Sequence, residues 1–264
     1  MPPDVAFVLL LIVKMAVSAC FVATASFVAE RAGVVMGAMV ASLPISVGPA
    51  YVFLAMDHDA SFIAASALAT LVSNAATTIF TVAYVFVAQR SGTWASFTAA
   101  LASWCAAWFI FARFSWNLPT AFIVNLVLLA VAITLVSRFR HAAMVVPQRR
   151  WYDLPLRAGL VATLVLAVVL VSARFGPTIS GVVAAFPVVF TSLILILHPR
   201  IGGRANAAVV ANAIPGMVGF MLSVVVVIVA AVPIGPPIAL SLALVTAVTW
   251  NLALLFARQR GLLS

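Results

Sequence analysis

The stretch "GAMVASLPISVGP", residues 37–49, lies in a run apolar enough to cross a membrane, yet it contains Pro44, Gly48 and Pro49. A proline inside a helix removes one backbone hydrogen bond and costs about 3 kcal/mol in a soluble protein. A second stretch, "SGVVAAFPVVFTS" at 180–192, places Pro187 in a similar apolar setting. Two related, proline-broken stretches predict a chain in which one unit is used twice.

The composition of the chain is that of a membrane protein. Of its 264 residues, 66% are hydrophobic and 7% are charged, and the mean hydropathy is +1.27. Long apolar runs without polar alternation favour membrane-spanning helices over a closed barrel. We expect an all-α polytopic protein with about nine transmembrane helices, at 5–29, 33–56, 61–88, 94–113, 118–137, 154–174, 178–197, 205–232 and 236–257.

The net charge of +9 does not indicate a nucleic-acid-binding protein, because the arginines are spread thinly between apolar spans. They are unequally divided between the two sides of the membrane. One side receives Arg31, Arg90, Arg138, Arg140, Arg149, Arg150, Arg200, Arg204, Arg258 and Arg260, whereas the other receives Arg113 and Arg174. Basic connections stay in the cytoplasm, so we expect a multi-pass protein of a bacterial-type inner membrane with its N-terminus outside and its C-terminus inside.

The two halves of the chain match when residue numbers are shifted by 143. The shift pairs Lys14 with Arg157, Arg31 with Arg174, Gly33 with Gly176 and Pro44 with Pro187. After a shorter connection, Asn74 falls on Asn212. We expect a first four-helix repeat at 1–113, a linking helix and basic loop at 114–153, and a second repeat at 154–264. Because the two copies begin on opposite sides, the repeats are inverted, as in many secondary transporters.

Each copy has a Lys or Arg early in its first span, a proline in its second, an "NA" pair in its third and a Trp in its fourth, Trp104 or Trp250. In size and order, this pattern resembles the GlpM-like small inner-membrane proteins, which have four spans. The chain resembles a fused, inverted pair of them. The resemblance implies an association with exopolysaccharide production and implies no settled biochemical activity. Copy two departs from copy one in having Arg157 for the lysine and no counterpart of Pro49.

The sequence offers little for an enzyme. The acids, Asp4, Glu30, Asp57, Asp59 and Asp153, all lie near predicted span ends or in connections. We interpret "MDHDA" at 56–60 as a solvated turn, and we expect no metal, no cofactor and no catalytic residue. Cys20 and Cys105 lie in apolar runs, and we expect them to be buried core residues without a disulfide.

Lys14 and Arg157 allow two interpretations. A cation within the membrane is costly and is a functional hypothesis by default. However, the distance from Lys14 to Arg31 nearly spans the hydrocarbon core, so both side chains could instead extend to the two interfaces. If they point inward, they form a pair of positive charges suited to an anionic group.

The prolines give the strongest indication of a binding site. A break in a helix frees backbone amides that attract anions, and breaks at corresponding positions of inverted halves point to a site at the membrane midplane. The candidate substrate-binding residues are Lys14, Pro44, Ser46, Asn74, Arg157, Pro187, Thr191 and Asn212, with Ser42 and Ser192 close by. The two asparagines could equally form interhelical hydrogen bonds that only stabilise the bundle.

Two functions remain open. The first is a small secondary transporter or flippase for an anionic or phosphate-bearing substrate, either a small molecule or a lipid-linked intermediate, with Arg31, Arg113, Arg174 and Arg258 flanking its two mouths. The second is an accessory membrane protein that supports envelope polysaccharide synthesis and transports nothing. In both cases the expected partners are membrane lipids and not nucleic acid, and the protein is a monomer or a homodimer.

Overall fold

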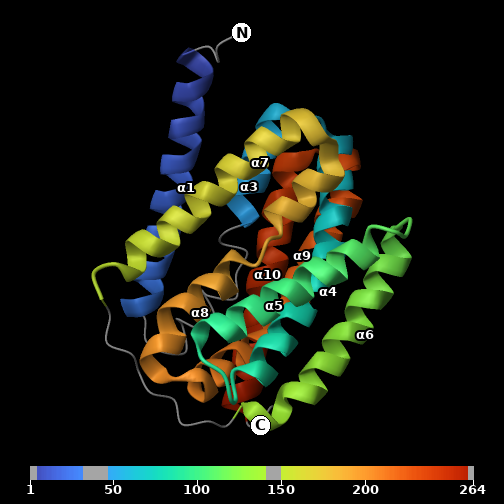
Figure 1. Ribbon diagram of the computed structural model, residues 1–264. Coiled ribbons are helices and arrows are strands. Elements are labelled where there is room, and N and C mark those ends of the chain that lie inside the picture. The colour runs from blue at the N-terminus through green and yellow to red at the C-terminus, as the bar shows by residue number, and fades with distance from the viewer. Residues whose placement is uncertain (1–4, 32–46, 141–149, 261–264) are drawn as a thin grey trace.

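The computed structural model describes residues 5–31, 47–140 and 150–260, and in α1 it describes the side chains of residues 9–24. This part of the chain is almost entirely helical and contains no strand (Figure 1). Its helices are α1 (Val5–Arg31), α3 (Val47–Asp57), α4 (Ala60–Val87), α5 (Thr93–Phe111), α6 (Leu118–Val136), the 3₁₀ helix η1 (Ser137–Phe139), α7 (Asp153–Ala184), α8 (Val188–Ile201), α9 (Gly203–Ile234) and α10 (Pro236–Gln259).

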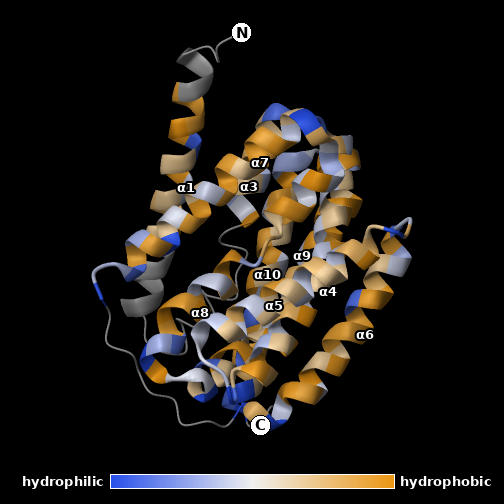
Figure 2. Ribbon diagram, in the orientation of Figure 1, coloured by the Kyte–Doolittle hydropathy of each residue, from blue (hydrophilic) through white to orange (hydrophobic). Residues whose placement is uncertain are grey.

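The described helices have the lengths and the surface of a membrane protein. Six of them, namely α4, α5, α6 with η1, α7, α9 and α10, are long and apolar enough to cross a bilayer. Large apolar side chains such as Ile123, Val131 and Val245 are exposed on the outside of the bundle. Figure 2 shows hydrophobic residues over most of the helices and hydrophilic residues mainly near their ends. The expectation of an all-α, multi-pass membrane protein is therefore confirmed.

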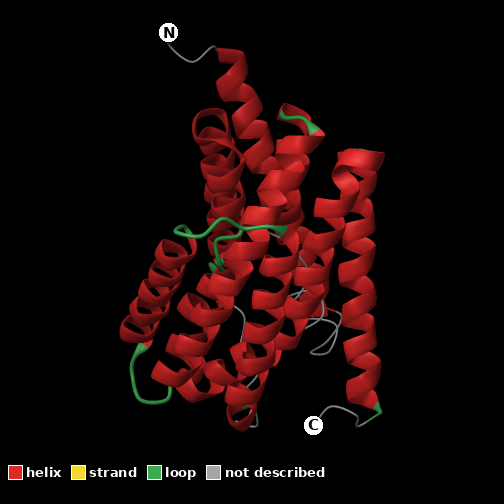
Figure 3. Cartoon of the chain, turned by 90° about the vertical axis from the view of Figure 1, so that its right-hand side faces the viewer, coloured by secondary structure: helices red, strands yellow, loops and turns green. Residues whose placement is uncertain are grey.

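Most helix ends lie where the sequence predicted them. The ends of α1, α4, α5, α6, α9 and α10 lie within two residues of the predicted spans. Of the span predicted at 33–56, only α3 belongs to the described residues. The helices run broadly along one direction, as Figure 3 shows from the side.

The centre of the bundle is the pair α4 and α9, which pack against each other. Most residues of α4 from Ser66 to Val85 are buried, and many of these residues are small. A Cβ at Gly203 would overlap the carbonyl oxygen of Ala88, so the start of α9 approaches the end of α4 closely. Small residues permit such close approach, which is the usual basis of helix packing in a membrane.

The segment from α7 to α8 is the most irregular part of the described chain. Gly176 has φ 75° and ψ −174°, a conformation that glycine adopts readily, and Pro177 begins the remaining helical turns of α7. The chain leaves the helix again at Ala185 and resumes as α8 after Pro187. The span predicted at 178–197 is therefore interrupted at Pro187.

The cysteines were placed wrongly by the sequence analysis. Cys20 and Cys105 are free, as expected, but both are exposed on the outside of the bundle and do not lie in its core. Apolar runs identify residues inside the membrane, but they do not separate the face toward lipid from the face toward protein, because both faces are apolar.

Candidate functional site

The helix break between α7 and α8 is the first feature of the candidate site. The amide of Ala185 donates to the Gly181 carbonyl oxygen at 3.1 Å, and the helix then stops. The amide of Val188 donates to Phe186 at 2.7 Å and not to Ala184, as it would in a continuous helix. The carbonyl of Ala184 thus lacks the amide partner that an unbroken helix would supply. Irregular backbone at membrane depth is tolerated where it is buried in protein or lines a cavity.

Two hydroxyl side chains lie in the first turns of α8. Thr191 is 4% exposed, and its Oγ1 has no hydrogen-bond partner within the described structure. Ser192 is also buried, but its Oγ donates to the carbonyl of Val189 at 2.7 Å. Thr191 is therefore the hydroxyl at this break that has unused hydrogen-bonding capacity.

A polar face of α4 lies against the segment of α7 that precedes the break. Thr70 Oγ1 donates to the carbonyl oxygen of Gly181 at 2.8 Å. Further along α4, Thr77 accepts a hydrogen bond from Trp104 Nε1 at 3.3 Å, and the ring of Trp104 packs edge-on against Phe186, with centroids 5.4 Å apart. The contacts at Gly181 and Phe186 thus align α4 with the chain as it approaches Pro187.

Two serines on this face of α4 have unused capacity. Ser66 and Ser73 are fully buried, and the Oγ of each is without a hydrogen-bond partner in the part of the chain that the structure describes. Sequence analysis missed this polar face. Its signal is the spacing of Ser66, Thr70, Ser73 and Thr77, at intervals of four, three and four residues, which places hydroxyls along one face of a helix.

Lys14 is buried and paired with a carboxylate. It is 3% exposed, and its Nζ forms an ion pair with Asp57 Oδ2 at 2.5 Å. The ammonium group also lies 5.7 Å from the centroid of the Phe53 ring. The "MDHDA" turn is consequently more than a solvated loop: Asp57 pairs with α1, while Asp59 caps α4 by accepting the Phe62 amide at 2.8 Å.

Arg157 lies one turn after Asp153, which forms an ion pair with Arg200. Asp153 Oδ2 accepts a hydrogen bond from Arg200 Nη1 at 2.7 Å, and its Oδ1 pairs with Nη2 of the same guanidinium. Arg157 is half-buried and lies close enough to Asp153 for their charges to interact. The structure thus links the start of α7 to the end of α8 through a bidentate pair.

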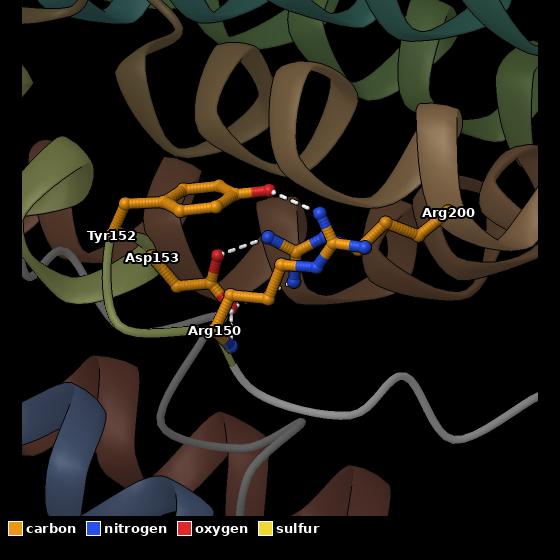
Figure 4. Close-up of polar contacts among 4 residues, drawn as sticks. All are labelled: Arg150, Tyr152, Asp153 and Arg200. Atoms are coloured by element: carbon orange, nitrogen blue, oxygen red, sulfur yellow. Dashed lines mark hydrogen bonds and ion pairs between the residues drawn. The ribbon is translucent and has the colours of Figure 1, made fainter.

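Tyr152 and Arg150 complete the group around Asp153 (Figure 4). Arg200 lies 5.1 Å from the centroid of the Tyr152 ring, and Arg150 Nη1 donates to the Tyr152 hydroxyl at 3.1 Å. Hydrogen bonding to Arg200, and then to Arg150, holds the pKa of Tyr152 below its ordinary value. The two guanidinium groups thus stabilise the phenolate form relative to that of a free tyrosine.

The structure gives Asn74 and Asn212 different partners. Asn74 Nδ2 donates to Asn125 Oδ1 at 3.0 Å, and Asn125 Nδ2 donates in turn to the Leu71 carbonyl at 2.8 Å. Asn74 thus joins α4 to α6, as the interhelical alternative expected. Asn212 Nδ2 instead donates to the carbonyl oxygens of Ala208 at 2.9 Å and Arg140 at 3.2 Å.

Two arginines lie around Asn212. Arg258 Nη2 donates to the Asn212 carbonyl oxygen at 3.0 Å. Arg140 Nε and Nη2 are buried and have no hydrogen-bond partner among the described residues. Burial, and then the charge of Arg258, lower the pKa of Arg140 from its ordinary value.

An apolar groove of about 440 Å³ lies between α1, α3, α9 and α10. Val17 and Phe21 line it from α1, and they follow Lys14 along the helix at spacings that place them near its face. Gly48 and Pro49 line it from the start of α3, and Ser223 contributes a hydroxyl-bearing residue from α9. Its chemistry suits a hydrocarbon chain, and neither Asn74 nor Asn212 belongs to its lining.

The remaining predicted site residues are dispersed. Pro44, Ser46 and Ser42 lie outside the described residues, as does the side chain of Arg31. Pro187 is buried at the break. The arginines predicted to flank the mouths, Arg113, Arg174 and Arg258, are all exposed.

Comparison with known proteins adds no relative. No protein-family model, no curated protein and no solved structure matches the chain.

Proposed function

We propose that the chain is a small secondary transporter or flippase that moves an anionic, phosphate-bearing substrate with an apolar tail across a bacterial-type inner membrane. The observation that carries the proposal is the break at Pro187, deep in the bundle, with the buried and unpartnered hydroxyl of Thr191 in the next turn. Broken helices at membrane depth are where transporters bind substrates, and the amides that begin a half-helix favour anions.

The proposed architecture is a pair of inverted repeats, and equivalent hydrogen bonds support it. Trp104 Nε1 in the fourth helix of copy one donates to Thr77, three residues after Asn74. Trp250 Nε1 in copy two donates to the carbonyl oxygen of Pro215 at 2.9 Å, three residues after Asn212. Equivalent tryptophans thus contact equivalent turns of the third helix in the two copies.

The ion pairs and the helix contacts follow the same two-fold pattern. Asp57 and Arg200 occupy equivalent positions under the shift of 143, and each forms an ion pair: Asp57 with Lys14 in α1, and Arg200 with Asp153 at the start of α7, four residues before the counterpart of Lys14. The fourth helix of each copy packs against the second helix of the other, α5 on α8 and α10 on α3. We propose nine spans on this basis, and the unequal distribution of arginines supports an N-terminus outside.

The apolar groove narrows the proposed substrate to one that carries a lipid-like tail. The start of α3, which lines the groove, is the counterpart under the repeat of the first turns of α8 at the Pro187 break. The groove has almost no polar lining, so a small hydrophilic anion would gain little from it. A polyprenyl phosphate or another lipid phosphate has both the anionic head and the apolar tail.

Thermal unfolding of the purified protein in detergent, against a panel of ligands, tests this proposal. The panel comprises polyprenyl phosphates, anionic lipids, nucleotide sugars, small organic anions and lipophilic cations. A ligand bound only to the folded state raises the unfolding midpoint. We expect lipid phosphates to raise it in the wild type, and Thr191→Val to weaken the effect.

Pro187→Ala and Pro199→Ala form a matched pair for the same experiment, because both prolines lie in or next to α8 but only Pro187 lies at the break. Pro187→Ala should lose the ligand response, whereas Pro199→Ala should retain it. A flat response across the panel in well-folded protein would contradict transport and favour the accessory role in envelope polysaccharide synthesis.

A further inference from the structure

The two arginines beside Asn212 form a cationic cluster at the place where η1 meets α9 and α10. Arg140 follows η1 directly, and its carbonyl oxygen accepts the Asn212 side chain at 3.2 Å. Arg258 binds the carbonyl oxygen of the same asparagine at 3.0 Å. Asn212 thus holds the backbone of Arg140 and the guanidinium of Arg258, and the two charges lie close enough to interact.

The guanidinium of Arg140 has hydrogen-bond donors that no described residue accepts. Its Nε and Nη2 are buried, and neither donates a hydrogen bond to any described residue. Leaving buried donors unsatisfied is costly, and a neighbouring like charge adds to that cost. Arg138 adds further positive charge nearby, where it stacks over the rings of Phe86 and Phe139.

The described carboxylates are occupied elsewhere. Asp57 pairs with Lys14, Asp153 pairs with Arg200, and Asp59 caps the start of α4. Among the residues that the structure describes, none of these acids is placed to neutralise Arg140. An anion from outside the chain would do so.

We propose that Arg140 and Arg258 bind the oxyanion of a phosphate group. Nε and Nη2 of one guanidinium form a planar fork that matches two oxygens of a phosphate, and Arg258 supplies a second charge. The phosphate belongs either to a lipid headgroup or to a soluble phosphate compound. This site stands on its own geometry and does not depend on whether the chain transports a substrate at the Pro187 break.

The test measures phosphate binding to the full-length protein in detergent through its unfolding midpoint. The ligands are sodium phosphate and dihexanoyl phosphatidic acid, each compared with sodium chloride at the same ionic strength. Arg140→Gln and Arg258→Gln should weaken the apparent affinity by about tenfold or more, because each removes charge-assisted hydrogen bonds. Arg260→Gln is the matched control, since Arg260 is exposed, near Arg258 and of equal charge. It should change the affinity by less than about twofold.

The midpoint without ligand separates binding from a structural role. Since the Nε and Nη2 atoms of Arg140 have no described protein partner, Arg140→Gln should leave the ligand-free midpoint unchanged or raise it. Stabilisation by both ligands assigns the site to phosphate groups in general, and stabilisation by the lipid alone assigns it to a headgroup. A wild-type protein that neither ligand stabilises more than chloride does would overturn the proposal. An equal loss of affinity in Arg260→Gln would overturn it too, because it would mean nonspecific attraction to surface charge.

Discussion

The ion pair of Lys14 with Asp57 shows how a single contact changes the interpretation of a charged residue inside a membrane span. Lys14 is almost completely buried, whereas the side chain of Asp57 is 32% exposed. Sequence alone could place Lys14 inside a span, but it could not supply its partner, which lies 43 residues away. The pairing makes Lys14 a link between α1 and α3 rather than a free cation.

The unequal burial of this pair predicts unequal effects of its two neutral variants. Asp57→Asn leaves an uncompensated buried charge and should destabilise the protein by about 3 kcal/mol. Lys14→Met leaves only a half-exposed carboxylate, so its cost should be smaller. Adding Lys14→Met to Asp57→Asn should recover stability, which thermal unfolding of the double-mutant cycle would measure. Additive effects of the two changes would contradict the pairing.

Tyr152 gives a pH-dependent signature of the Arg200 cluster. Its pKa in the folded protein lies below the unfolded value near 10, chiefly because of hydrogen bonding to Arg200. Its phenolate therefore contributes stability above the unfolded pKa, and this contribution disappears as the pH falls through the folded pKa.

An ultraviolet titration of the wild type minus Tyr152→Phe isolates this tyrosine. Phenolate should appear at a lower pH than in a free tyrosine, and Arg200→Gln should move the transition upward. Arg113→Gln, which changes an exposed arginine elsewhere, serves as the control. A transition that Arg200→Gln leaves in place would exclude the proposed cause.

At the scale of the elements, hydrophobic runs predicted most helix ends, because the length of an apolar run limits where a membrane helix can stop. The interruption at Pro187 also followed from sequence, since a proline cannot supply the amide that a helix needs. The polar face of α4 and the partners of Asn74 and Asn212 did not follow. These contacts depend on which faces of the helices meet. Uniformly apolar helices have little periodicity in their sequence from which those faces could be predicted.

The close approach of α7 to α4 predicts a strong effect at one glycine. A Cβ at Gly181 would overlap the backbone carbonyl oxygen of Ser66, and backbone cannot move aside easily. Gly181→Ala should therefore destabilise the protein by about 2 kcal/mol or more. Gly159→Ala, in the same helix but with nothing within 4 Å of the added Cβ, should be neutral or slightly stabilising. Equal midpoints for the two variants in thermal unfolding would contradict the packing of α7 on α4.

At the scale of the molecule, the inverted arrangement predicts where equivalent connections lie. His58 precedes the third helix of copy one, and Arg204 lies at the start of the third helix of copy two. In a background with Cys20→Ala and Cys105→Ala, a cysteine at position 58 should react with an impermeant maleimide added outside intact cells. A cysteine at position 204 should react only after the membrane is opened. Reaction of both from the same side would contradict the inverted repeat.

The most direct test of the central claim is a lipid translocation measurement in vesicles that contain the purified protein. The probe is a phosphatidic acid with a fluorescent acyl chain, and dithionite added outside destroys the fluorescence of every copy that reaches the outer leaflet. We predict that the wild type brings inner-leaflet probe outward much faster than protein-free vesicles do, that Pro187→Ala reduces the rate by about tenfold or more, and that Pro199→Ala does not. If well-folded wild-type protein leaves the inner-leaflet probe protected, translocation of lipid phosphates by this chain is contradicted.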